Sequence, residues 1–186
     1  MYRPVEAPDS FDFNPELPPL PAELDVSTGT WETAYSSEGN IVLTLSEWIE
    51  GGKNVVFSDS EDVADGMVET RFRDATAAGF VVRTDTGHNS GYLIHVQGDG
   101  VMVRDFADMS TMVSAVIPDG IDRFQWHTLR AEYEGDEIKI YLDPAEDSDP
   151  VLTFTDTTYQ TGRPALWGGP GVLFGSFISL AKKDNY

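Results

Sequence analysis

The sequence predicts an all-β protein whose strands pair antiparallel in a sandwich or barrel. From Thr30 onward, short runs rich in β-branched and aromatic residues follow one another. Gly, Asp, Asn and Pro separate these runs at intervals of about eight to twelve residues, which is typical of antiparallel sheets joined by turns. No segment has a sustained helical period, so a parallel sheet with crossover helices is disfavoured.

The predicted strands are residues 30–35, 41–48, 53–58, 66–73, 78–84, 91–97, 100–106, 112–116, 126–134, 137–142, 150–155, 164–168 and 172–180. Within a strand, successive side chains point to opposite faces. In "EIKIYLD", Ile138, Ile140 and Leu142 therefore form a core face, and Lys139 and Tyr141 form the other. The other face of each strand can therefore carry functional residues.

The first 24 residues differ from the rest of the chain. Prolines are dense there, which excludes a helix and favours an extended arm. We expect residues 1–24 to form this arm, with Phe11, Phe13 and Leu17 as anchors, and residues 25–186 to form the sandwich. The arm would lie against its own domain or against a neighbouring protein chain.

Charge and composition exclude several classes of function. The chain has 12 basic and 32 acidic residues, a net charge of -20, and no cysteine. A field of this sign repels phosphates and anionic lipid headgroups, so we expect neither nucleic acid nor membrane as a partner. Disulfides and thiolate metal sites are excluded, and the three histidines fit no familiar zinc spacing.

The opening "MYRPVEAPDS" lacks the basic and then apolar pattern of a secretory signal. We therefore expect a protein that is intracellular, already trimmed, or released by another route such as lysis. The localisation stays unknown, with an extracellular or virion-surface position favoured.

Three segments resemble the concanavalin A-like lectin and glucanase superfamily, in particular its laminin-G-like and bacterial glycan-binding branches. They are "DGMVETRFRDATAAGFVVRTDTGHNSGYLIHV" (65–96), "FQWHTLRAEYEGDEIKIYLD" (124–143) and "GRPALWGGPGVLFGSFISL" (162–180). The resemblance implies a two-sheet antiparallel jelly roll and a carbohydrate partner. It is a pattern of strands and contains no catalytic signature.

Glucanases of this superfamily carry two Glu flanking an Asp on one strand, because retaining hydrolysis needs two carboxyl groups about 5 to 5.5 Å apart. This chain has no such motif. On the comparable strand, Glu69 shares its face with Arg71 and Arg73. The sequence therefore favours a non-enzyme, although a polysaccharide hydrolase or lyase remains an alternative.

A hairpin predicted over residues 83–97 supplies the candidate binding site. Alternation directs Arg83 and His95 outward, where they would join Arg71 in a polar strip across one sheet. Sugar hydroxyls bind to such planar donors and acceptors, while aromatic rings stack on the apolar face of the sugar. The full set of predicted ligand-binding residues is Arg71, Arg83, His88, Asn89, Tyr92, His95, Tyr141 and Trp167. The alternative is a solvated face on which the arginines pair with Glu69 and Asp85.

The loop "SDSEDVADG" (58–66) is acidic enough to hold a cation. Calcium takes six to eight oxygen ligands, and crowded carboxylates on one turn provide them. The candidate ligands of a structural calcium ion are Asp59, Glu61, Asp62 and Asp65. The alternative is a solvated loop that discourages edge-to-edge aggregation.

Two functions follow from these observations. The first is a non-catalytic glycan-binding or surface-attachment lectin-like domain. The second is a structural decoration or tail component of a phage virion or other assembly, anchored by residues 1–24.

Overall fold

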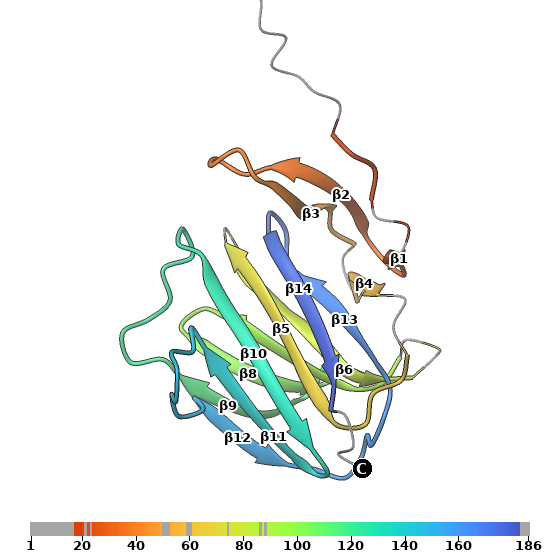
Figure 1. The fold of residues 1–186 in the computed structure, drawn as a ribbon, viewed down its shortest axis with the longest axis vertical. Helices are drawn as coiled ribbons and strands as arrows, with labels where there is room; N and C mark the ends of the chain where they lie inside the picture. Colours follow the sequence, from red (N-terminus) through yellow and green to blue (C-terminus); the bar gives the residue numbers. More distant parts are fainter. Residues whose placement is uncertain are drawn as a thin grey trace, which may run out of the picture.

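The computed structural model describes residues 17–20, 22, 24–49, 53–58, 61–73, 75–85, 87 and 89–182, and these form two seven-stranded antiparallel sheets (Figure 1). Sheet A has the order β1 (Leu24–Val26), β4 (Val55–Ser58), β13 (Arg163–Gly168), β6 (Ala77–Thr84), β7 (Tyr92–Gln97), β8 (Gly100–Asp105), β9 (Thr111–Val116). Sheet B has the order β12 (Leu152–Thr155), β11 (Glu137–Leu142), β10 (His127–Glu134), β5 (Gly66–Arg73), β14 (Leu173–Ala181), β3 (Ile41–Glu47), β2 (Thr30–Tyr35).

The predicted fold class is confirmed. Every predicted strand range overlaps a strand of the structure, and the described residues contain no helix. Within these ranges, accordingly, no helix has the length and apolar character needed to cross a membrane. In Figure 1, β10, β5 and β14 of sheet B run side by side and cross the strands of sheet A. The strand that the sequence missed, β1, is three residues long and gives too short a pattern for alternation to be detected.

The main core fills the space between the two sheets. Ile138 and Ile140 are fully buried there, and Leu142 packs against the same cluster, as alternation predicts. Large aromatic side chains close one end, where the ring of Trp31 stacks on that of Phe174 with centroids 6.1 Å apart. Burial of this apolar surface is the main source of stability.

Sheet A is also covered on the face that points away from this core. Every residue of β6 is buried, so both faces of that strand are packed. The outer face carries a second apolar cluster of Val55, Ala77, Val81, Leu93, Phe106, Ala165 and Trp167. This outer face of sheet A is the floor on which the candidate site is built.

Only the end of the predicted arm lies within the described residues. Leu20 and Leu24 pack against the main core, and the carbonyl oxygen of Pro18 accepts a hydrogen bond from Thr33 Oγ1. Leu17, a predicted anchor, is 42% exposed. The other two predicted anchors, Phe11 and Phe13, lie outside the described residues.

Candidate functional site

A groove of about 520 Å³ lies on the outer face of sheet A. Its walls come from the segment before β4, the start of β6, the ends of β7 and β8, the loop after β8, and the end of β13 with the turn that follows it. The lining residues are Trp48, Lys53, Thr76, Ala77, Gln97, Arg104, Ala107, Asp108, Met109, Trp167, Gly169 and Pro170.

The strand register brings an indole and an imidazole together on this face. Trp167 of β13 is opposite Gly79 of β6, and Gly79 is opposite His95 of β7. A Cβ atom at Gly79 would lie 2.8 Å from the Cβ of His95, a distance that real side chains do not adopt. Because residue 79 has no side chain, the rings of Trp167 and His95 approach with their centroids 5.0 Å apart.

Two tryptophans meet at the edge of the groove. Trp48 is 37% exposed, and its ring stands nearly perpendicular to that of Trp167, with centroids 6.4 Å apart. Trp167 itself is only 6% exposed and lies within β13, as the predicted strand 164–168 indicates. Trp48 therefore presents the accessible ring, and Trp167 supports it from below.

Several hydrogen-bonding atoms beneath the groove have no protein partner. Among the described residues, no group forms a hydrogen bond with either ring nitrogen of His95, with Trp167 Nε1 or with Arg104 Nε. Burial, and secondarily the charge of Arg104, lowers the pKa of His95 to about 4. The imidazole is therefore neutral at pH 7 and offers one donor and one acceptor.

Two cations line the groove. Lys53 Nζ donates to the carbonyl oxygen of Asn89 at 2.7 Å and lies 4.4 Å from the centroid of the Phe106 ring. Burial lowers the pKa of Lys53, against the opposing influence of Asp85 and Asp105. On β8, Arg104 Nη2 donates to Gln97 Oε1 at 3.3 Å. The groove thus contains two positive charges in a protein that is otherwise strongly acidic.

The prediction that Arg83 points outward is wrong. Its side chain is 2% exposed, and its φ of 54° lies in the left-handed region. The pairing of β6 with β13 contains a bulge at this point, which interrupts the alternation of faces. The guanidinium turns inward and donates to the backbone carbonyl oxygens of Ala64, Gly135 and Tyr159.

Tyr92 is also buried, and it contacts the main core. Its hydroxyl donates to Asp156 and accepts from the backbone N–H of Tyr159. Burial together with the Asp156 bond raises the pKa of Tyr92 to about 12. The predicted surface made by Arg83, His95 and Tyr92 does not exist, because these side chains lie on different faces of sheet A.

The predicted polar strip is likewise divided between two sheets. Arg71 and Tyr141 lie on the outer face of sheet B, whereas His95 belongs to sheet A. The guanidinium of Arg71 stacks over Trp126 at 4.5 Å, and Tyr141 donates to Glu132. Sequence alternation assigns a residue to a face, but it cannot tell which sheet a strand joins.

The residues at the tip of the hairpin are only partly described. His88 lies outside the described residues. The side-chain amide of Asn89 donates to the Gly87 carbonyl oxygen, and its backbone N–H donates to Asp85 Oδ1. Asn89 therefore shapes the turn, and it reaches the groove through the bond from Lys53 to its carbonyl oxygen.

The calcium ligands predicted in the loop 58–66 stay a prediction. Asp62 lies 3.6 Å from Arg163, and Asp65 lies 3.6 Å from Arg83 and accepts from the backbone N–H of Gly135. Glu61 is exposed, and Asp59 lies outside the described residues. Over the ranges that the structure covers, no three His, Asp or Glu side chains form a group suited to a metal ion.

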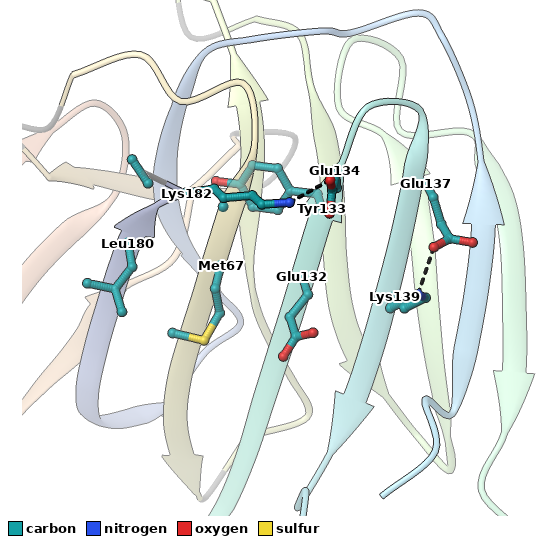
Figure 2. A pocket seen from close by; sticks show the side chains of 10 residues that line it. Met67, Glu132, Tyr133, Glu134, Glu137, Lys139, Leu180 and Lys182 are labelled. Carbon is teal, nitrogen blue, oxygen red and sulfur yellow. Dashed lines mark ion pairs between the residues drawn. The ribbon is translucent and has the colours of Figure 1, made fainter. Parts of the chain in front are cut away.

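A shallower pocket of about 310 Å³ lies on sheet B (Figure 2). Lys182 is directed toward Glu134, and Lys139 toward Glu137 at 2.8 Å. Met67 and Leu180 form its apolar part. Because both lysines are already paired, this pocket is a weaker candidate for ligand binding than the groove on sheet A.

Sequence reasoning placed His95 and Trp167 among the site residues, and the structure brings these two together. It missed Lys53, Gln97 and Arg104 as site residues. Alternation from His95 to Gln97, and from Met102 to Arg104, indicates which face these side chains occupy. Their meeting with Trp48 depends on how loops fold over the sheet, which no local pattern predicts.

Comparison with known proteins bears on the fold. No protein-family profile and no curated protein sequence matches the chain. Among solved structures, carbohydrate binding module CBM66 from Bacillus subtilis is similar with a TM-score of 0.67 and 24% identity, over 84% of this chain and 94% of that one. The β-glucanase of Bacillus licheniformis is similar with a TM-score of 0.51 and 15% identity, over 86% of this chain and 95% of that one. The chain therefore has the jelly-roll fold of the concanavalin A-like lectins and glucanases.

Proposed function

We propose that the groove on sheet A binds carbohydrate. The observation that carries this proposal is the position of the exposed Trp48 ring beside the hydrogen-bonding side chains of Gln97 and Arg104 in one cavity. An indole offers a flat apolar surface to the axial C–H groups of a sugar, and planar amide and guanidinium groups match its hydroxyls.

The groove is suited to binding and not to hydrolysis. Glycosidases use a pair of carboxyl groups, about 5 to 5.5 Å apart in retaining enzymes and about 6.5 to 9.5 Å apart in inverting ones. Asp108 is the one carboxylate among the lining residues that the structure describes. Glu69, which occupies the comparable central strand, lies on sheet B and is 2.6 Å from Arg130. A non-catalytic module is therefore the favoured role.

The comparisons agree with this proposal without establishing it. The similar structure from Bacillus subtilis is described as a carbohydrate binding module. The concanavalin A-like fold serves binding proteins and hydrolases alike, so the residues of the groove, and not the fold, favour binding.

A glycan array followed by titration calorimetry tests the proposal, with and without calcium. Trp48→Ala should weaken binding of the best glycan about tenfold or more, which corresponds to about 1.4 kcal/mol. Phe124→Ala is the matched control, because Phe124 is an exposed aromatic residue that does not line the groove. Unchanged affinity in the Trp48 variant, or equal losses in both variants, would reject the groove as the binding site.

A further inference from the structure

Among the described lysines and arginines, some lie beside a carboxylate and others do not. Most arginines and lysines that the structure describes lie within 4.0 Å of a carboxylate: Arg73, Arg83, Arg130, Lys139, Arg163 and Lys182. Four described cations have no such partner among the carboxylates that the structure describes. Arg71 and Arg123 are exposed and stack on aromatic rings. The two half-buried ones, Lys53 and Arg104, line the same groove.

The salt bridges among the described residues include neither of these two cations, although the chain is strongly acidic. Asp85 and Asp105 are near enough to Lys53 to raise its pKa, but Asp85 accepts from the backbone N–H of Asn89, and Asp105 accepts from Tyr159 Oη and from the backbone N–H of Ala107. Asp108, on the groove wall, accepts from the backbone N–H of Ser110 and is exposed. Each nearby carboxylate therefore already binds a group of its own loop.

We propose that the groove selects saccharides that carry an anionic substituent, a carboxylate or a sulfate, which Lys53 and Arg104 bind. This inference rests on the proposed carbohydrate-binding function. An ammonium group has three donors, and Lys53 uses one of them on the Asn89 carbonyl. The guanidinium of Arg104 forms only long bonds from Nη2, to Gln97 Oε1 at 3.3 Å and to Met102 Sδ at 3.9 Å. A planar oxyanion accepts two parallel N–H groups from such a fork.

The net negative charge of the molecule does not prevent an anionic saccharide from binding in the groove. Charges on the far side of the protein are screened over about 10 Å at 0.1 M ionic strength, whereas partly buried neighbours are screened much less. The two cations therefore contribute more to the potential inside the groove than distant carboxylates do, although Asp108 lines the groove as well. His95 adds no positive charge, because it is neutral at pH 7.

The test compares acidic glycans with their neutralised counterparts. The array should contain oligogalacturonides and their methyl esters, and sulfated disaccharides and the same sugars without sulfate. We expect at least tenfold tighter binding of one acidic member than of its neutral partner. The carboxylate and sulfate pairs identify which anion is preferred.

Two variants connect the preference to the groove. Lys53→Met keeps an apolar stem over Phe106, and Arg104→Gln keeps a polar group; each should remove most of the preference for the acidic glycan. Lys139→Met is the matched control, because it makes the same change in net charge at a lysine on sheet B that does not line the groove. Thermal melting of Lys53→Met verifies that the fold is intact.

The outcomes separate the two proposals. If no saccharide binds, the carbohydrate-binding function is rejected and this inference with it. If only neutral glycans bind, or if Lys53→Met and Arg104→Gln keep the preference for an acidic glycan, the groove still binds sugar and the anionic selectivity alone is rejected.

Discussion

The guanidinium of Arg83 joins three separate segments at one end of the sandwich. It binds the carbonyl oxygens of Ala64, Gly135 and Tyr159, and it lies 5.3 Å from the centroid of the Tyr133 ring. The carboxylate of Asp65 lies 3.6 Å from the guanidinium and is partly exposed. Removing the side chain would leave buried carbonyl groups without donors, which is costly.

We expect Arg83→Ala to lower the free energy of unfolding by about 3 to 5 kcal/mol, as is typical when one partner of a buried charged network is removed. Arg71→Ala, at an exposed position, should cost less than about 1 kcal/mol. Urea denaturation of both variants measures the difference. A loss below 1 kcal/mol for Arg83→Ala would contradict a structural role.

Alternation alone could not predict the direction of the Arg83 side chain. Alternation correctly placed His95 and Gln97 on one face of β7, because that strand is regular. It failed at Arg83, because a non-glycine residue with positive φ beside a bulge leaves no mark in the local pattern.

His95 makes the stability of the fold depend on pH. Its pKa is about 4 in the folded protein and about 6.5 when unfolded. Between these values the unfolded chain binds more protons, so this contribution is fully present above pH 6.5 and is lost as the pH falls toward 4. We expect His95→Phe to remove the part of the pH dependence of the free energy of unfolding that His95 contributes. The loss in the parent protein is on the order of 3 kcal/mol.

Chemical denaturation at half-unit steps from pH 7 to pH 4 measures this slope in both proteins. His127→Asn is an informative comparison. Burial of His127 lowers its pKa, but the hydrogen bonds to Asp143 and to the Asp122 carbonyl raise it more. A raised pKa adds stability that is fully present below about pH 6.5 and is lost as the pH rises above it, so between pH 7 and pH 6 the parent should gain stability that this variant does not gain. Equal slopes in all three proteins would contradict both assignments.

At the scale of elements, the end of the predicted arm packs against the sandwich. Leu20 and Leu24 lie in the predicted arm, yet they pack against the main core, and β1 pairs with β4. A proline-rich composition describes the backbone but does not reveal that its leucines fill a gap at the edge of a sheet. The strands, in contrast, were predictable because alternation and turn residues are local signals.

Deleting residues 1–24 should therefore destabilise the protein more than deleting residues 1–16. Only the longer deletion removes Leu20 and Leu24, and losing two partly buried leucines costs about 1 to 3 kcal/mol. Leu24→Ala should reproduce part of the loss, whereas Leu17→Ala, at an exposed position, should not. Equal stability of the two truncated proteins would mean that this segment contributes nothing to the core. Sedimentation of the same proteins measures any role of the arm in assembly.

At the scale of the whole molecule, the sequence predicted the architecture but not the groove. The groove combines residues from Trp48 to Pro170, and its cations are brought together by loops whose paths depend on tertiary packing. Composition alone indicated that anionic partners are disfavoured. The structure shows that two positive charges are nevertheless concentrated at one place, which an average over the chain cannot reveal.

The net charge itself should limit stability. With -20 spread over 186 residues, the folded state confines like charges at short distances, and this self-repulsion favours the expanded chain. Raising the NaCl concentration from about 0.01 M to about 0.5 M shortens the screening length from about 30 Å to less than 8 Å. The melting temperature at pH 7 should therefore rise.

Near the isoelectric point of about 4.2 the net charge disappears, so the same salt should have little effect on the melting temperature there. Differential scanning calorimetry at both pH values makes the comparison. An equal rise at pH 4.2 would assign the effect to salt-strengthened burial of apolar surface instead of to charge screening.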